Sequence, residues 1–116
     1  MTKYDAVERI RKSIDSGAQV ITPKGLIYEK YVESQTQFLL DHVIEPVQAK
    51  VTSACFPEYD FENYKNSEVW CIARSGNSWL LHNVNENEFA LGFGESEASI
   101  SMLGFSSPDA LAEWLG

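Results

Sequence analysis

The sequence predicts one α+β domain over residues 1–116, an antiparallel sheet of about four to six strands covered by N-terminal, middle and C-terminal helices. Three observations lead to this class. An amphipathic helical pattern begins the chain, alternating apolar residues flank turn signals in residues 68–94, and a capped helical pattern ends it. The 116 residues suit one domain, and the 44% hydrophobic content argues against disorder.

The first expected element is a helix over residues 3–16. Thr2 is placed to cap it, with Asp5 three residues later in an approximate capping box. Gly17 suits the left-handed position that ends a helix. Two groups of side chains occupy its faces: an apolar stripe of Tyr4, Val7, Ile10 and Ile14, and a basic patch of Arg9, Arg11 and Lys12 that we expect to face solvent.

Residues 18–34 allow two interpretations. Residues 19–22 resemble a short strand, and Pro23-Lys24-Gly25 has turn composition. Residues 26–32 could form another strand, or they could begin a long helix, because apolar residues from Tyr28 onward also recur at helical spacing.

Residues 35–44 favour a helix, with Ser34 as its cap. Pro46 disfavours helical geometry at the preceding residue and supplies a stop. A strand over residues 47–54 follows. Residues 56–65 then alternate aromatic and acidic side chains.

Residues 68–74 and 78–84 predict a β-hairpin. Gly76-Asn77 fits the central positions of a type II′ turn, and this turn sets the register. The expected cross-strand pairs are Arg74 with Trp79, Ile72 with Leu81, Cys71 with His82, and Val69 with Val84.

A second turn near Glu86-Asn87 leads into a strand over residues 88–94. If that turn is tight, Val84 meets Phe89, His82 meets Leu91 and Leu80 meets Phe93. One face of the meander then carries Val69, Cys71, Ala73, Leu80, His82, Val84, Phe89, Leu91 and Phe93, and it is predicted to be core. The other face carries Trp70, Ile72, Arg74, Trp79, Leu81 and Asn83, with Trp79 lying across Gly94.

The last two elements are a possible strand over residues 99–103 and a helix over residues 108–115. Ser107 is placed to cap this helix, Pro108 suits its first position, and Asp109 suits the positive end of its dipole. Its sheet-facing residues are Leu111, Trp114 and Leu115.

The charge distribution is lopsided. Residues 1–57 contain seven basic and seven acidic side chains, whereas residues 58–116 contain ten acidic side chains against Lys65 and Arg74. The net charge of −8 therefore comes from the second half. This balance argues against nucleic-acid binding and favours a basic partner, although acidity also serves solubility alone.

Cys71 and His82 form the one nucleophile–base arrangement that the predicted register produces, because paired residues lie about 5 Å apart. Both project into the predicted core, where a cysteine usually acts as a small hydrophobe. A small ligand-binding or enzymatic domain that uses this pair is the alternative function, and we expect no catalytic residue. Cys55 and Cys71 are expected to be free thiols of a reducing, cytoplasmic compartment, since no signal peptide is evident.

No cofactor or metal motif is recognisable. His42 and His82 are isolated, the cysteines lie far apart, and residues 60–63 lack the glycine of a calcium loop. Gly92-Phe93-Gly94 resembles no phosphate loop, and no apolar run is long enough to span a bilayer. The sequence leaves the oligomeric state open.

The face that carries Trp70 and Trp79 has two interpretations. A helix covers it and makes a second core layer, or it is a partly exposed aromatic patch with an acidic rim, as binding surfaces often are. In the second case, the expected partner-binding residues are Glu58, Asp60, Glu62, Trp70, Trp79, Glu86 and Glu88.

Residues 67–115 resemble the C-terminal part of small bacterial immunity proteins. The resemblance rests on Ser67-Glu68-Val69-Trp70-Cys71-Ile72-Ala73-Arg74 leading into Trp79-Leu80-Leu81, and on Phe105-Ser106-Ser107-Pro108-Asp109-Ala110-Leu111-Ala112-Glu113-Trp114-Leu115. The SUKH class and the immunity proteins of contact-dependent inhibition have such a sheet followed by a short helix. The resemblance implies a cytoplasmic inhibitor that occludes a toxin domain, often a basic nuclease. A non-inhibitory adaptor is a further alternative.

Overall fold

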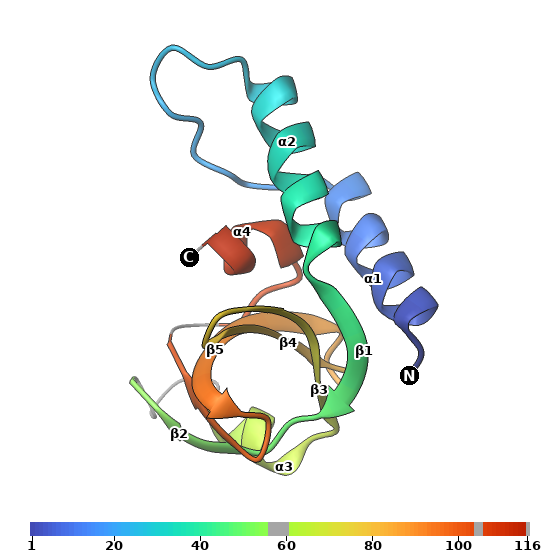
Figure 1. Ribbon diagram of the computed structural model, residues 1–116, viewed down its shortest axis with the longest axis vertical. Helices are drawn as coiled ribbons and strands as arrows, with labels where there is room; N and C mark the ends of the chain where they lie inside the picture. Colours follow the sequence, from blue (N-terminus) through green and yellow to red (C-terminus); the bar gives the residue numbers. More distant parts are fainter. Residues whose placement is uncertain (56–60, 104–105, 116) are drawn as a thin grey trace.

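The computed structural model describes residues 1–55, 61–103 and 106–115, in which four helices pack on one six-stranded sheet (Figure 1). The strand order is β1-β3-β4-β5-β6-β2, and every pairing is antiparallel except that of β2 with β6. The α+β class is therefore confirmed. The elements are α1 (Lys3–Asp15), α2 (Tyr28–Asp41), β1 (Val43–Gln48), β2 (Val51–Ala54), α3 (Phe61–Asn66), β3 (Val69–Ser75), β4 (Ser78–Asn83), β5 (Glu88–Ser96), β6 (Ser99–Met102) and α4 (Ala110–Leu115).

Helix α1 forms as the sequence predicts, except that it ends at Asp15 and that Tyr4, expected in its apolar stripe, is 72% exposed. Its capping box is complete, because the Asp5 amide donates to Thr2 Oγ1 at 3.1 Å and the Thr2 amide donates to Asp5 Oδ2 at 2.9 Å. Hydrogen bonds from the backbone and the side chain of Thr2 lower the pKa of Asp5. Gly17 follows with a φ of +107°, a conformation that few residues other than glycine adopt.

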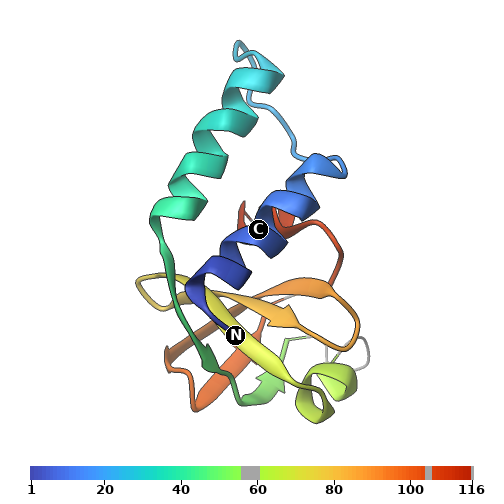
Figure 2. The same ribbon diagram turned by 90° about the vertical axis from the view of Figure 1, so that its right-hand side faces the viewer.

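Helix α2 corrects the prediction for residues 18–44. It begins at Tyr28, so the helical alternative for residues 26–32 holds, and residues 19–22 form no strand. Ser34 lies inside the helix, and the N-cap residue Ile27 makes no side-chain capping bond. The helix ends at Asp41. Residues 16–27 connect α1 to α2, and most of this connection extends away from the sheet (Figures 1 and 2).

Strands β1 and β2 are two halves of one bent segment, separated only by Ala49 and Lys50. The first half pairs with β3 at one edge of the sheet, and the second half pairs with β6 at the other edge. The sheet therefore curls round on itself, as Figure 1 shows. Pro46 lies within β1 and not at a helix stop, and an edge strand tolerates its missing N–H.

The predicted register of the first hairpin is confirmed next to the turn, but it is wrong from Cys71 to Val69. Gly76 has a φ of +60°, and Arg74 pairs with Trp79 as predicted. The register then shifts by one residue between Cys71 and Ala73, which is a β-bulge at Ile72. Cys71 consequently pairs with Leu81, Trp70 with His82 and Val69 with Asn83.

The second turn is also longer than predicted. Residues 84–87 form a four-residue loop in which Asn87 takes a φ of +52° and the Glu86 amide donates to Asn83 Oδ1 at 3.2 Å. Phe89 therefore pairs with His82 and not with Val84. This slip of two residues preserves the faces of β5. The same slip places Leu80 opposite Leu91 and Trp79 opposite Gly92.

The two faces of the sheet contribute to two separate cores. The helix-side core lies between the sheet and α1, α2 and α4, and its largest members are Ile10, Leu39, Ile72, Leu80, Phe89, Leu111 and Trp114. The inner core lies inside the curl and is closed by Tyr64 of α3, and it includes Val69, Cys71, Trp79, Leu81, Ile100 and Met102. Trp79 thus belongs to a second core layer, which the curl of the sheet and α3 create together.

The C-terminal elements match the prediction apart from their bounds and the cap of the helix, which is Asp109 and not Ser107. Strand β6 ends one residue early, at Met102, and α4 starts at Ala110. Asp109 caps α4, because its Oδ1 accepts from the Ala112 amide at 3.0 Å, while Ser107 Oγ accepts from the Asp109 amide at 3.2 Å.

Candidate partner-binding surface

Cys71 and His82 do not form the predicted pair. The bulge at Ile72 places them on opposite faces of the sheet, Cys71 in the inner core and His82 against Phe89 on the helix side. Both side chains are fully buried. Burial raises the pKa of the Cys71 thiol to about 12, and burial together with the positive charge of Arg9 lowers the pKa of His82 to about 4. The alternative function therefore lacks the contact between the Cys71 thiol and the His82 imidazole that it requires.

Four acidic residues lie on elements at one end of the sheet. Glu62 lies on α3, Glu68 directly precedes β3, and Glu86 and Glu88 lie on the loop and the strand after β4. Two hydrogen bonds tie the start of β3 to that loop: the Glu68 amide donates to Asn85 Oδ1 at 3.1 Å, and the Val84 amide donates to the Glu68 carbonyl at 3.0 Å. Figure 2 shows α3 at the same end. We call Glu62, Glu68, Glu86 and Glu88 the acidic end.

Trp70 is an aromatic residue beside the acidic end. Its indole Nε1 donates to Glu68 Oε2 at 3.0 Å, and its ring packs against the edge of the helix-side core. The side chain is partly buried, beside Gln48 on one neighbouring strand and His82 on the other. The bulge that separates Cys71 from His82 is also what sends Trp70 to this side of the sheet. An aromatic ring held by a carboxylate thus adjoins the acidic end.

The four carboxylates differ in their exposure to solvent and in the hydrogen bonds that they accept. Glu62 and Glu86 are exposed, and Glu62 accepts one bond from Asn66 Nδ2 at 3.2 Å. Glu88 is partly buried and accepts from Ser106 Oγ at 2.7 Å. Over the described ranges, none of the four takes part in an ion pair. Their negative charge is therefore screened mainly by solvent.

The structure brings four of the seven predicted partner-binding residues to one end: Glu62, Trp70, Glu86 and Glu88. Trp79 is not among them, because it lies near the opposite end of β4 and is only 2% exposed. Its indole donates to the Gly94 carbonyl at 2.8 Å. Glu58 and Asp60 lie outside the described residues. The prediction omitted Glu68, whose spacing of two residues from Trp70 was the available signal.

A second exposed surface lies on the loop between α1 and α2, which the sequence did not single out. Its apolar side chains stand open to solvent, with Ile21 92% exposed, Leu26 56% and Ile27 58%. This loop and α3 lie at opposite ends of the molecule (Figure 1). The acidic end and the apolar loop are therefore two distinct surfaces that can be altered independently.

The described part of the chain contains no cluster of three or more histidine, cysteine or acidic residues that could hold a metal ion. Its helices are also too short or too polar to cross a membrane. No protein-family model, curated protein or solved structure matches the sequence. The function is therefore inferred from the surfaces themselves.

Proposed function

We propose that the protein is an acidic protein-binding module of the immunity type, which occludes a basic toxin or nuclease domain through its acidic end. The observation that carries the proposal is Trp70, whose indole is fixed by Glu68 beside exposed carboxylates. Aromatic residues near the centre of an interface supply much of its binding energy, and charges at the rim supply complementarity.

The electrostatic part of the proposal follows from the placement of charge. The chain carries a net charge of −8, and Glu62 and Glu86 extend into solvent without a cationic partner in the described ranges. A surface of this kind attracts a positively charged domain over roughly one Debye length, about 10 Å at 0.1 M salt. Such steering raises the association rate more than it slows dissociation.

Occlusion needs no chemistry from the inhibitor. A partner that binds the acidic end would be covered by α3, the start of β3 and the β4–β5 loop, which the inner core and two backbone-anchored hydrogen bonds hold in place. A preformed surface avoids the entropic cost of ordering on binding. The same surface would also serve an adaptor, so inhibition has to be measured separately from binding.

The test uses the purified product of the neighbouring gene as the candidate partner. We compare the double charge reversal Glu62→Lys/Glu86→Lys with the matched reversal Glu95→Lys/Glu97→Lys, whose carboxylates are also exposed but lie on the β5–β6 hairpin. The first variant should lower the association rate and its salt dependence, and the second should change both far less. Rates are measured by biolayer interferometry at two salt concentrations.

Two further variants locate the anchor. Trp70→Phe removes the indole N–H while keeping most of the ring, and Trp70→Ala should speed dissociation by an amount worth about 2 kcal/mol or more. Leu26→Ser, on the apolar loop, should leave binding unchanged. If Leu26→Ser lost binding and the acidic-end variants kept it, the interface would be the apolar loop and not the acidic end. An inhibition assay on the partner's activity then separates an inhibitor from an adaptor.

A further inference from the structure

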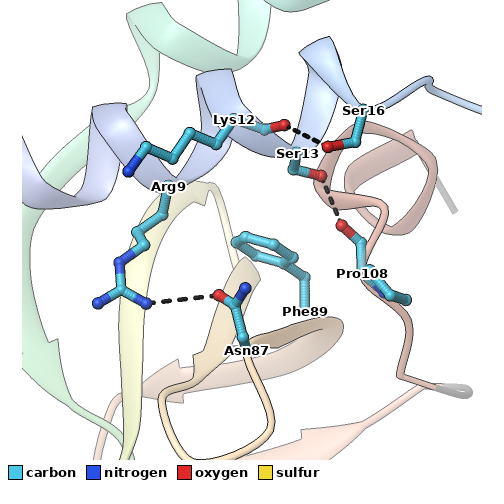
Figure 3. Close-up of a pocket in the computed structure, with 7 residues that line it drawn as sticks. All are labelled: Arg9, Lys12, Ser13, Ser16, Asn87, Phe89 and Pro108. Carbon is cyan, nitrogen blue, oxygen red and sulfur yellow. Dashed lines mark hydrogen bonds between the residues drawn. The ribbon is translucent and has the colours of Figure 1, made fainter.

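A pocket opens between α1, the β4–β5 loop and the segment that leads into α4 (Figure 3). Its volume is about 280 Å³, just below the range of about 300–1,000 Å³ for ligand sites. Its lining brings together residues from distant parts of the sequence, namely Arg9, Lys12, Ser13, Asn87, Phe89 and Pro108. The sequence indicated only that Arg9 and Lys12 belong to a solvent-facing basic patch, because their neighbours in the fold are more than 70 residues away in the chain.

The pocket is cationic in an acidic protein. Arg9 and Lys12 lie three residues apart on α1, which places them on the same face of the helix. In the described ranges neither side chain forms an ion pair, although the protein has eight more acidic than basic residues. Arg9 makes two long contacts, from Nη1 to His82 Nε2 and to Asn87 Oδ1, both at 3.4 Å. Most of its N–H groups thus remain available to a ligand.

The buried side chain of His82 contacts the Arg9 guanidinium from the protein interior. The histidine is fully buried, and its Nδ1 lies 3.1 Å from the Glu88 carbonyl, which can only accept a hydrogen bond. Nδ1 therefore carries the proton, and Nε2 presents a lone pair to Arg9. Because burial keeps the imidazole neutral near pH 7, His82 orients the guanidinium without repelling it. Such support from a buried polar group is typical of a preorganised binding site.

The opposite wall is rigid and less polar. Ser13 Oγ donates to the Pro108 carbonyl at 2.6 Å and accepts from the Ala110 amide at 2.8 Å, so this hydroxyl is already used. The ring of Phe89 forms the floor and faces the pocket (Figure 3). The pocket therefore offers a cationic wall to a charged group and an aromatic surface to an apolar one.

We propose that this pocket binds a small organic oxyanion, with its carboxylate or phosphate against Arg9 and Lys12 and its apolar body on Phe89. The planar guanidinium forms paired hydrogen bonds to either group, and the ammonium adds a point charge. A site with two cations that form no ion pair in the described ranges favours an anion over a neutral molecule of the same shape. This ligand site shares the β4–β5 loop with the acidic end, but the proposal does not depend on the partner-binding function.

The experiment titrates the ¹⁵N-labelled protein with four probes at constant ionic strength and follows amide and Arg side-chain resonances. Benzoate and phenyl phosphate present the two charged groups on the same ring, benzyl alcohol presents the ring alone, and inorganic phosphate presents the charge alone. Saturable shifts at Ser13, Asn87 and Phe89 with benzoate or phenyl phosphate are expected. The stronger of these two probes identifies the charged group that the pocket prefers.

Three variants distinguish binding in this pocket from non-specific attraction of anions to the protein. Arg9→Gln should weaken binding by at least about tenfold, as for loss of a charge-assisted contact. Arg11→Gln removes the same charge from an exposed position outside the pocket and should change binding by less than about twofold. Lys12→Gln alters an exposed side chain and keeps the test valid if Arg9→Gln fails to fold.

Three results would overturn the proposal. The first is the absence of saturable shifts with both organic anions, and the second is equal weakening by Arg9→Gln and Arg11→Gln. The third is binding of inorganic phosphate as tight as that of phenyl phosphate, because the ring would then contribute nothing and Phe89 would not be part of a ligand site.

Discussion

The neutral state of His82 makes a measurable prediction about stability and pH. His82 is fully buried, and its pKa falls to about 4 from the ordinary value of 6.5. The unfolded chain therefore binds a proton in a pH range where the folded protein does not. Because stability rises with pH wherever the unfolded state binds more protons, the folded protein should lose stability as the pH falls from about 6.5 to about 4.

The magnitude follows from these two pKa values. The penalty is RT ln[(1 + 10^(6.5 − pH))/(1 + 10^(4 − pH))], using the folded and ordinary values of His82. It is about 0.2 kcal/mol at pH 7 and about 2 kcal/mol at pH 5, so the loss between them is close to 2 kcal/mol. At still lower pH the penalty levels off at about 3.4 kcal/mol, the limit set by the difference between the two pKa values.

The assay is urea unfolding at about pH 7 and about pH 5 for the wild type and for His82→Gln. Titrating carboxylates contribute to both proteins, so the difference between the two pH dependences isolates the histidine. The wild type should lose about 2 kcal/mol more than the variant. His42→Gln changes the other histidine, which is partly exposed, and should retain the full loss. Equal pH dependence in the wild type and His82→Gln would refute the reasoning.

Three other predictions concern the inner core. Gly92→Ala should destabilise the protein by about 1–3 kcal/mol in urea unfolding, because the added Cβ would lie 2.6 Å from the nearest side-chain atom; an unchanged midpoint contradicts this. A thiol reagent at pH 8 should modify exposed Cys55 at once and buried Cys71 only on unfolding, since a pKa of about 12 leaves roughly one thiol in ten thousand ionised; two fast thiols would disprove it. Trp79→Phe should cost about 1–2 kcal/mol, because the Gly94 carbonyl loses its donor, and thermal melting checks this.

The parts of the fold that the sequence predicted correctly are those set by local chemistry. Thr2 and Asp5 form their capping box whatever else the chain does, and Gly76 supplies the left-handed conformation that its turn needs. Both signals lie within four residues of the structure that they specify. The two long helices follow the same rule, since α2 begins where helical spacing begins even though no side chain caps it.

The predictions of register and turn length were wrong where the structure depends on the shape of the whole sheet. The bulge at Ile72 accompanies a sheet that must curl far enough to close an inner core, and nothing near Ile72 in the sequence encodes that curl. One inserted residue then separated Cys71 from His82 and sent Trp70 to the helix side. The loop at residues 84–87 depends on the Asn83 side chain, whose bond to the Glu86 amide lengthens the turn.

The candidate sites were predictable to different degrees. The acidic residues could be identified from composition, but their common location depends on the hydrogen bond that ties the β4–β5 loop to Glu68 at the start of β3. The cationic pocket was hidden, because Arg9 meets His82 and Asn87 only after the sheet has folded against α1.

The bent segment that supplies both edge strands has a kinetic consequence. The β3–β4 hairpin joins residues that are neighbours in the chain, whereas β2 reaches β6 only when Val51 finds Ile100. Loops of that length close late, because their entropy must be lost before any contact compensates for it. We therefore expect the seam between β2 and β6 to form after the transition state for folding. Substitutions along the seam should speed unfolding and leave the refolding rate nearly unchanged, so the seam would set how long the folded protein lasts.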